Sequence, residues 1–280
     1  MDYIDQVICG HNVDIMRQIP NACVDLIVTS PPYDNIRDYK GYCFDFEGIA
    51  NECYRVLKPG GVMVYIIGDQ YIDGFRSNTS IRQLLHFETI GFKTHDIMIW
   101  IKDPRYPGNV RYSQCFEFMF ILSKGIPKTI HLLRDRENIT QRIWPNGLTK
   151  RLVDGSMIRD DTKDRCIGEF GFRWNAWYEH GSANQTDKTA LEHPASFPDK
   201  LAEDHILSWS NPNDLILDPF LGSGTTAKMA YLNHRHYCGI DISSEYCALA
   251  KKRIHLMSPA KYQSQNVKEI AKQTESLGEY

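Results

Sequence analysis

The 280-residue sequence contains no apolar stretch long enough to cross a membrane. Its longest uninterrupted apolar run covers residues 62–67, whereas a membrane-spanning helix needs about 20 apolar residues. The first residues also lack the basic region followed by an apolar region that marks a secretory signal. We therefore expect a cytoplasmic protein.

The sequence also lacks any Cys-x-x-Cys pair, although it contains eight cysteines. Paired spacing of this kind is typical of zinc sites, and a disulfide framework is typical of short secreted chains. The cysteine pattern therefore predicts no metal site and no disulfide framework, which agrees with a reducing compartment.

Positive charge is in slight deficit, since the formal net charge is −3, but its distribution is uneven. Residues 102–151 carry ten Lys or Arg against four Asp or Glu, whereas the segments on either side are acidic. A basic stretch of this kind is compatible with a surface that follows nucleic-acid phosphates. A solvated face without a partner explains the same charge equally well.

Length and composition indicate one large α/β domain, or a domain with an insertion, because 42% hydrophobic residues can fill a sizeable core. Apolar runs predict strands, and apolar residues at helical spacing predict helices. The expected strands are 24–28, 62–67, 96–101, 115–122, 215–217 and 237–240. The expected helices are 13–19, 46–57, 79–91, 198–209, 225–232 and 243–257, with residues 58–61 ending the second.

Periodicity fades between residues 123 and 190. This stretch contains two segments rich in arginine and the tryptophans Trp144, Trp174 and Trp177. A long segment without regular pattern inside a compact domain is usually functional or disordered, and its aromatic content argues against disorder. We expect a functional insertion here.

The strand that ends at Val28 leads into Thr29-Ser30-Pro31-Pro32-Tyr33. Two prolines cannot continue a strand ladder, so a stiff loop must begin there. The Ser30 hydroxyl and the Pro31 carbonyl can both accept hydrogen bonds from an exocyclic amine, which localises the lone pair of its nitrogen, and Tyr33 offers a face for stacking a base. A strand followed by two prolines is also a common structural turn.

A second motif, Asp218-Pro-Phe-Leu-Gly-Ser-Gly-Thr-Thr226, lies between an expected strand and an expected helix. Gly222 and Gly224 allow backbone N–H groups to approach a ligand at the start of that helix. Asp241 follows the next strand, where an acid can bind ribose hydroxyls. The same spacing fits a dinucleotide-binding turn, so an NAD-dependent oxidoreductase is an alternative. No Gly-Lys-(Ser/Thr) sequence follows the turn, which argues against a nucleotide triphosphatase.

Together, the Ser30-Pro-Pro-Tyr33 loop and the Asp218 motif resemble the DNA amino-methyltransferases of the N4-cytosine and N6-adenine type. The resemblance covers roughly residues 3–255. Because the loop precedes the cofactor motif, with a variable segment between them, the order resembles the β arrangement of that family. The sequence departs from the family at the first turn, where Gly10-His11 replaces the usual Gly-Asp pair.

The resemblance implies a doubly wound, mostly parallel α/β sheet with an inserted target-recognition segment. It implies a catalytic half over residues 1–122, a recognition segment over 123–190, a cofactor-binding half over 191–257 and a polar tail over 258–280. The cofactor implied is S-adenosylmethionine. The partners implied are double-stranded DNA, a possible cognate restriction endonuclease and a possible second copy of the chain, in a bacterium, an archaeon or a phage.

By the same resemblance, each candidate site residue receives a role. The catalytic candidates are Ser30, Pro31, Pro32 and Tyr33. The cofactor candidates are Asp218, Phe220, Gly222, Ser223, Gly224, Thr225 and Asp241. The DNA-binding candidates are Arg134, Arg136, Arg142, Lys150 and Arg151.

Ser30 favours cytosine N4 as the methylated atom, because adenine enzymes of the family mostly carry Asp at this position. Adenine N6 is the alternative, since both bases place an acceptor nitrogen beside the amine. A DNA-binding module that has lost turnover is a further alternative, against which the intact loop and glycine turn argue. For Glu117, inside the apolar run 115–122, the alternation of a half-buried strand predicts an exposed side chain.

Overall fold

The computed structural model describes residues 2–32, 44–102, 112–138, 148–160, 169–178, 197–256 and 258–264. The chain divides into two compact units. The larger unit combines Met1–His131 with Asn175–Tyr280, and the smaller unit is Leu132–Trp174. Each unit is described by itself.

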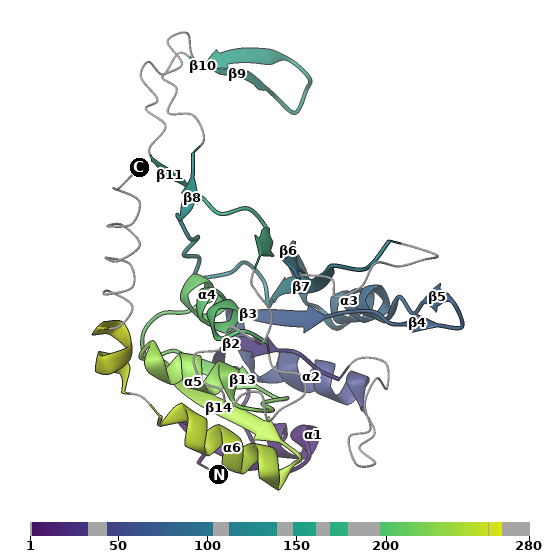
Figure 1. Cartoon of the computed structure of the whole chain (residues 1–280). Helices are drawn as coiled ribbons and strands as arrows, with labels where there is room; N and C mark the ends of the chain where they lie inside the picture. Colours follow the sequence, from purple (N-terminus) through teal and green to yellow (C-terminus); the bar gives the residue numbers. More distant parts are fainter. Residues whose placement is uncertain are drawn as a thin grey trace. The chain divides into compact units, whose positions relative to one another are not determined.

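The larger unit is built on an eight-stranded sheet in the order β1-β14-β13-β2-β3-β7-β6-β12 (Figure 1). Strand β7 is antiparallel to both of its neighbours, and the other described pairings are parallel. This order confirms the prediction of a mostly parallel sheet. The strands are β1 (Gln6–Cys9), β2 (Val24–Thr29), β3 (Leu57–Ile67), β6 (Lys93–Ile101), β7 (Phe116–Ser123), β12 (Ala176–Tyr178), β13 (Leu215–Asp218) and β14 (His236–Asp241).

The helices form two groups, as expected for a doubly wound sheet. One group is α1 (Asn12–Met16), α2 (Phe46–Val56) and α3 (Thr79–Ile90), and the other is α4 (Asp199–Trp209), α5 (Thr225–Leu232) and α6 (Ser244–Ile254). Within each group, consecutive helices pack on each other. The main apolar cluster takes helical residues from the first group, so the second group covers the opposite face of the sheet.

Helix α2 shows how the sequence forms one of these elements. Asp45 caps its start by accepting a hydrogen bond from the Gly48 amide at 2.9 Å. Its buried residues, Ile49, Ala50, Cys53 and Val56, follow helical spacing and face the sheet. The helix ends at Val56, just before residues 58–61, which were expected to end it. These residues also belong to β3, in which Leu57 pairs with Val24 and the pairing resumes at Val62 after a register shift.

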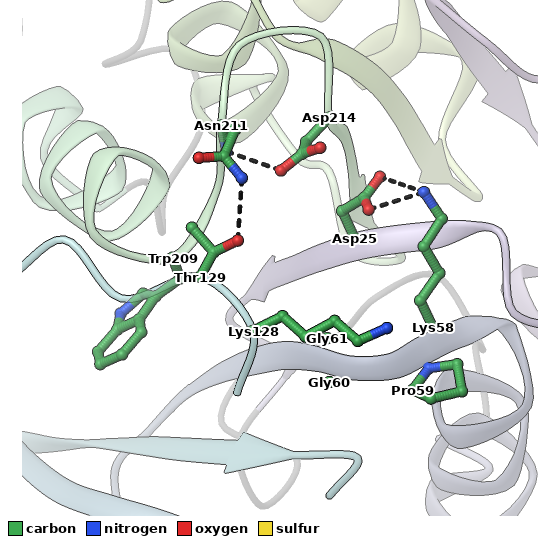
Figure 2. Close-up of a pocket in the computed structure, with 10 residues that line it drawn as sticks. All are labelled: Asp25, Lys58, Pro59, Gly60, Gly61, Lys128, Thr129, Trp209, Asn211 and Asp214. Carbon is green, nitrogen blue, oxygen red and sulfur yellow. Dashed lines mark hydrogen bonds and ion pairs between the residues drawn. The ribbon is translucent and has the colours of Figure 1, made fainter. Parts of the chain in front are cut away.

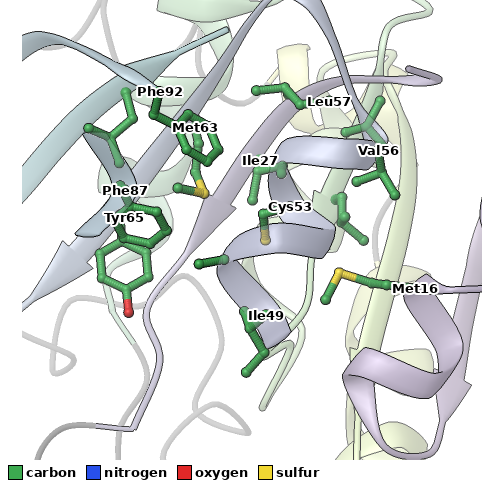
Figure 3. Packing of buried hydrophobic residues seen from close by; sticks show 14 of the residues in the cluster. Met16, Ile27, Ile49, Cys53, Val56, Leu57, Met63, Tyr65, Phe87 and Phe92 are labelled. Atoms are coloured by element: carbon green, nitrogen blue, oxygen red, sulfur yellow. The ribbon is translucent and has the colours of Figure 1, made fainter. Parts of the chain in front are cut away.

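Aromatic rings fill the core between the sheet and this group of helices (Figure 3). Phe87 meets the Tyr65 ring edge-on at 4.9 Å and the Phe92 ring at 5.5 Å between centroids. Tyr65 donates its hydroxyl hydrogen to Gln83 Oε1 at 2.8 Å, which satisfies a polar group that no water reaches. Burial raises the pKa of the neighbouring Cys53 thiol to about 12, so this cysteine acts as a small apolar residue.

Glu117 corrects a prediction. Its side chain was expected to be exposed, but it is only 16% exposed and pairs with Lys102. Lys102 also lies 4.0 Å above the Trp100 ring. Strand β7 lies between β3 and β6, and Glu117 pairs with Trp100 of β6, so the neighbouring strand places Lys102 and Trp100 beside the carboxylate.

The smaller unit contains two short antiparallel pairs of strands. Strand β8 (Arg136–Glu137) pairs with β11 (Phe170–Gly171), and β9 (Leu148–Arg151) pairs with β10 (Met157–Asp160). Such short ladders match the weak periodicity of this part of the sequence.

In the larger unit, the described part of the tail is helical at residues 259–264. Tyr262 is buried there and donates a hydrogen bond to Glu203 of α4 at 3.0 Å. Residues 265–280 lie outside the described part of the chain. Across the residues that are described, none of the helices has the length and apolar character required to span a bilayer.

Candidate active site

The carboxyl ends of β1, β14, β13, β2 and β3 meet at one edge, because these neighbouring strands are parallel. The Ser30 loop follows β2, the glycine turn follows β13, and Asp241 ends β14. Ligands of doubly wound sheets bind at this edge. The structure therefore brings together the two motifs that the sequence separates by about 190 residues.

The proline loop begins with its first residues well packed. Pro31 is buried, and Ser30 and Pro32 are half-buried. The strand before them is anchored by the pairing of Thr29 with Tyr65 of β3. Tyr33, the fourth catalytic candidate, lies outside the described residues.

Asp218 links the loop to the glycine turn. Its Oδ1 accepts a hydrogen bond from the Thr29 hydroxyl at 2.7 Å and another from the Phe220 amide at 3.0 Å. Burial raises the pKa of Asp218 to about 6, and the hydrogen bonds from Thr29, Thr226 and Phe220 act in the opposite direction. Thr29, the first residue of the loop motif, was not among the site candidates, because its bond to Asp218 joins two strand ends that meet only in the folded sheet.

The glycine turn uses a backbone conformation that favours glycine. Gly222 and Gly224 have φ angles of +52° and +86°, and Gly224 is the N-cap of α5. A Cβ atom at Gly224 would lie 2.7 Å from the Cβ of Ala250 on α6. Glycine at this position therefore also permits the close approach of two helices, in addition to any contact with a ligand.

Asp241 binds the backbone of two loops at once. Its Oδ2 accepts from the Gly222 amide and its Oδ1 from the Ser243 amide, both at 2.8 Å. Burial raises the pKa of Asp241, and these two N–H donors act in the opposite direction. Each carboxylate oxygen has a second lone pair, so a ligand hydroxyl can still be accepted.

The first turn of the chain joins the same edge. The Gly10 amide donates to the Asp241 carbonyl at 2.9 Å, and Asn12 Nδ2 donates to the Pro219 carbonyl at 3.3 Å. His11, where the sequence departs from the family, lies 3.8 Å from Asp14 and is about one-third exposed. The buried Asn12 was not among the sequence candidates, although it follows directly on the turn that was singled out.

A buried cluster of charged side chains contacts the glycine turn and holds it in place. The Arg253 side chain is fully buried and donates to the Ser223 carbonyl at 2.6 Å, to Ser223 Oγ at 2.7 Å and to Thr225 Oγ1 at 3.3 Å. Asp199, at the start of α4, lies 3.5 Å from Arg253 and 2.9 Å from Lys228. These residues tie α4, α5 and α6 to the turn. Arg253 was hidden in the sequence because it occupies an apolar position of an otherwise amphipathic helix.

In the smaller unit, two arginines each lie over an aromatic ring. The Arg134 guanidinium lies 4.3 Å from the Phe172 ring centroid, and that of Arg136 lies 4.3 Å from the Trp174 ring centroid. Arg173 instead pairs with Asp135, with its Nε 3.0 Å from the carboxylate. We call Arg134, Arg136, Phe172 and Trp174 the arginine–aromatic ladder.

The other DNA-binding candidates are less completely described. Arg151 is exposed at the end of β9. Lys150 lies in the same strand, but its side chain is outside the described part of the structure, and Arg142 lies outside the described residues altogether.

A cavity of about 360 Å³ opens at the opposite, amino-terminal edge of the sheet (Figure 2). Its polar groups are largely paired with one another. Lys58 donates to both oxygens of Asp25 at 2.7 and 2.8 Å, and Asn211 bonds Thr129 and Asp214. Because the cavity lies at the amino-terminal edge, it is remote from the loops at the carboxyl edge that carry the predicted chemistry. Among the described residues, no group of three or more His, Cys, Asp or Glu side chains is placed to hold a metal ion.

A family model described as DNA methylase, of the N6/N4 type, matches residues 24–252. The orphan methyltransferase M.BamHII of Bacillus amyloliquefaciens is 51% identical over 246 residues, which cover 85% of this chain and 91% of that relative. The type II methyltransferase M.BglII of Bacillus subtilis is 28% identical over 89% of this chain and 68% of its own length.

Solved structures share the fold at lower identity. PvuII DNA methyltransferase, which is named as cytosine-N4-specific, is 21% identical with a TM-score of 0.65, covering 92% of this chain and 90% of its own. The modification methylase TTHA0409 of Thermus thermophilus, in complex with S-adenosylmethionine, is 24% identical with a TM-score of 0.61, covering 89% and 92%.

Proposed function

This chain belongs to the N6/N4 family of DNA methylases, and we propose that it transfers a methyl group from S-adenosylmethionine to the exocyclic amine of a base rotated out of duplex DNA. One observation carries the proposal. The Ser30 loop and the Asp218 turn end neighbouring parallel strands and are joined by the hydrogen bond from Thr29 to Asp218.

The residues at the carboxyl edge fit the proposed cofactor. Backbone N–H groups at the start of α5 suit its carboxylate, since the helix dipole favours negative charge there. Asp218 and Asp241 supply acceptors for its ammonium and ribose hydroxyl groups. Phe220 is half-buried and supplies apolar surface. When bound, S-adenosylmethionine supplies a methyl group on a sulfonium, which is a good leaving group.

The contribution of the Ser30 loop is positioning. Ser30 Oγ and the Pro31 carbonyl would accept the two amine hydrogens and direct the nitrogen lone pair toward the methyl carbon. Nitrogen, carbon and sulfur must be collinear for the transfer, so fixed acceptors account for much of the catalysis, and no base need remove a proton first. Pro32 restricts the backbone of the buried Pro31 to extended conformations, so the direction of the Pro31 carbonyl is limited, which supports this role.

For the target atom, we propose N4 of cytosine, with N6 of adenine as the alternative. Serine at position 30 carries the choice, because a hydroxyl can accept from the amine and can also donate to the ring nitrogen beside it. A carboxylate at this position would only accept.

The test is to incubate the protein with labelled S-adenosylmethionine and mixed-sequence duplex DNA, digest the DNA to nucleosides and identify the labelled one by mass spectrometry. We expect N4-methylcytosine. Labelled N6-methyladenine alone would overturn the choice of base and leave the enzyme class in place. If no nucleoside is labelled although the protein binds duplex DNA, the alternative of a DNA-binding module without turnover is the correct one.

The proposed partner is double-stranded DNA. A cognate restriction endonuclease and a second copy of the chain are further proposals from family membership, tested by the neighbouring genes and by sedimentation. The relative named M.BamHII is described as an orphan methyltransferase. The name of that relative implies no paired endonuclease, so the proposal of a cognate endonuclease needs its own test.

A further inference from the structure

A β-hairpin leaves the sheet beside the Ser30 loop. Thr29 pairs with Tyr65, so Ser30 is level with Ile66 on the neighbouring strand, and β3 ends one residue later. Neighbouring strands are about 4.8 Å apart. The hairpin, β4 (Tyr71–Ile72) and β5 (Phe75–Arg76), follows within a few residues and lies beyond the end of β3 in Figure 1.

The base of the hairpin is fixed by buried hydrogen bonds. The Asp69 side chain is 0% exposed and accepts from Arg76 Nε, from the Ser80 amide and from Ser80 Oγ, each at 2.8 Å. The turn residues Asp73 and Gly74 have φ angles of +50° and +85°, as the preferred two-residue hairpin turn requires. The base of the hairpin is therefore held in a defined position.

The two faces of the hairpin differ. Tyr71 pairs with Arg76 and Ile72 pairs with Phe75, and successive pairs point to opposite faces. On one face, the Arg76 guanidinium lies 5.8 and 5.7 Å from the ring centroids of Phe116 and Phe118, while Tyr71 beside it is 45% exposed. On the other face, Ile72 and Phe75 are 51% and 79% exposed.

We propose that Ile72 and Phe75 form an apolar wedge that contacts the bases of duplex DNA beside the extruded base. This inference rests on the proposed function. Rotating a base out of the duplex breaks its stacking, and an apolar side chain placed against the opened step replaces part of it. The hairpin follows the end of β3, the strand next to the one that leads into Ser30, so it extends from the edge of the sheet that carries the Ser30 loop. Stacking of an aromatic side chain on one base is worth about 5- to 150-fold in affinity.

The charges of the hairpin favour base contact over phosphate contact. Arg76 is paired with Asp69, and the exposed tip carries the acidic Asp73. An acidic tip does not follow phosphates, so the wedge contributes no counterion release. The affinity that it adds is therefore independent of salt.

The test uses the full chain with Phe75→Ala and Ile72→Ala. Ile126→Ala is the matched control, because Ile126 is 88% exposed and lies just after the end of β7, at the amino-terminal edge of the sheet. The dissociation constant for mixed-sequence duplex DNA is measured at several salt concentrations. We expect Phe75→Ala to weaken binding about tenfold and Ile72→Ala less, with the salt slope unchanged, and Phe75→Trp to retain wild-type affinity. Thermal melts of each variant check that it is folded.

Three results overturn the wedge: affinities equal to that of Ile126→Ala, a salt slope that falls together with affinity, or a shift from dimer to monomer in sedimentation with unchanged DNA affinity. The last would make the hairpin a self-association surface. Failure of the proposed function is a separate result, namely no methyl transfer by the wild type, and the binding measurement tests the wedge in that case too.

Discussion

Asp218 is a carboxylate placed where water does not reach it, since it is only 2% exposed. Its pKa of about 6 in the folded protein exceeds its usual value of 3.8 because of burial. Between these pH values the folded state holds a proton that the unfolded state has lost, so stability falls as the pH rises through this window. Two pKa units correspond to about 3 kcal/mol.

We therefore expect Asp218→Asn to gain stability over the wild type as the pH rises from about 4 to about 6, by up to about 3 kcal/mol, with a constant difference above about pH 7. The same variant should lose affinity for S-adenosylmethionine. Urea unfolding at a series of pH values measures the difference, and Asp73→Asn, at the exposed hairpin turn, is the control. If the free energy of unfolding changes with pH in the same way for the wild type and the variant, the charge on Asp218 does not destabilise the folded protein.

Asp241 joins two loops through its two oxygens, so removing it affects both structure and binding. We expect Asp241→Ala to reduce affinity for S-adenosylmethionine by about tenfold or more, since hydrogen bonds to a charged group are worth roughly 1.5 to 3 kcal/mol. Asp241→Asn keeps one acceptor oxygen and should be the more stable variant. Calorimetry measures the affinity, and unchanged binding in a folded variant would remove Asp241 from the site.

At the scale of elements, Gly224 fixes the approach of α5 to α6. We expect Gly224→Ala to destabilise the protein for two reasons, the positive φ of +86° and the 2.7 Å contact with Ala250. Gly125→Ala isolates the first reason, because Gly125 has φ +84° and nothing within 4 Å of its added Cβ. The backbone strain is worth about 1 kcal/mol or more in both variants.

Adding Ala250→Gly to Gly224→Ala should restore the stability lost through the contact with Ala250. The gain is reduced by about 1 kcal/mol, the cost of a glycine inside α6. Chemical unfolding of the wild type and these three variants gives the comparison. Equal losses in Gly224→Ala and Gly125→Ala would mean that the helices separate freely.

The arginine–aromatic ladder is the corresponding feature of the smaller unit. Phe172 and Trp174 hold the guanidinium groups of Arg134 and Arg136, and Arg136 Nε also donates to the Phe172 carbonyl at 2.9 Å, so the terminal nitrogens are the donors that can reach phosphates or bases. We expect each arginine-to-alanine change to weaken duplex DNA binding and to lower the salt slope by about one unit per lost phosphate contact. Arg173→Ala is the matched control, since Asp135 already neutralises that arginine. If the salt slopes of Arg134→Ala, Arg136→Ala and Arg173→Ala are equal, the DNA does not contact the ladder.

At the scale of the whole molecule, Arg253 connects three helices to the glycine turn. Removing one member of a buried charge pair commonly costs about 3 to 5 kcal/mol, because the other charge is left without its partner. We expect Arg253→Met to lose stability on this scale and to bind S-adenosylmethionine more weakly, whereas Lys252→Met, at an exposed position of the same helix, should change little.

Added S-adenosylmethionine should stabilise the wild type by about 2.7 kcal/mol at one hundred times its dissociation constant, and Arg253→Met by less at the same concentration. Unfolding with and without the cofactor gives both quantities. A stability loss no larger than that of Lys252→Met would show that Lys228 alone balances Asp199.

The sequence by itself determined the class of fold and the order of the two motifs. Apolar runs and helical spacing depend on neighbours within one element, so they placed the central strands and most of the helices to within a few residues. The motifs were visible for the same reason, since the Ser30 loop and the Gly222–Gly224 turn each occupy a few consecutive residues.

The tertiary structure alone decided how these pieces are joined. The bond from Thr29 to Asp218 connects residues 189 apart, and the contact of Arg253 with Ser223 connects residues 30 apart. Glu117 was misplaced for a related reason, because its burial depends on the strands that flank β7 and not on β7 itself. Local pattern reports which side of an element is apolar. Long-range pairing determines what that side meets, and therefore which polar groups are buried, paired and held in place for chemistry.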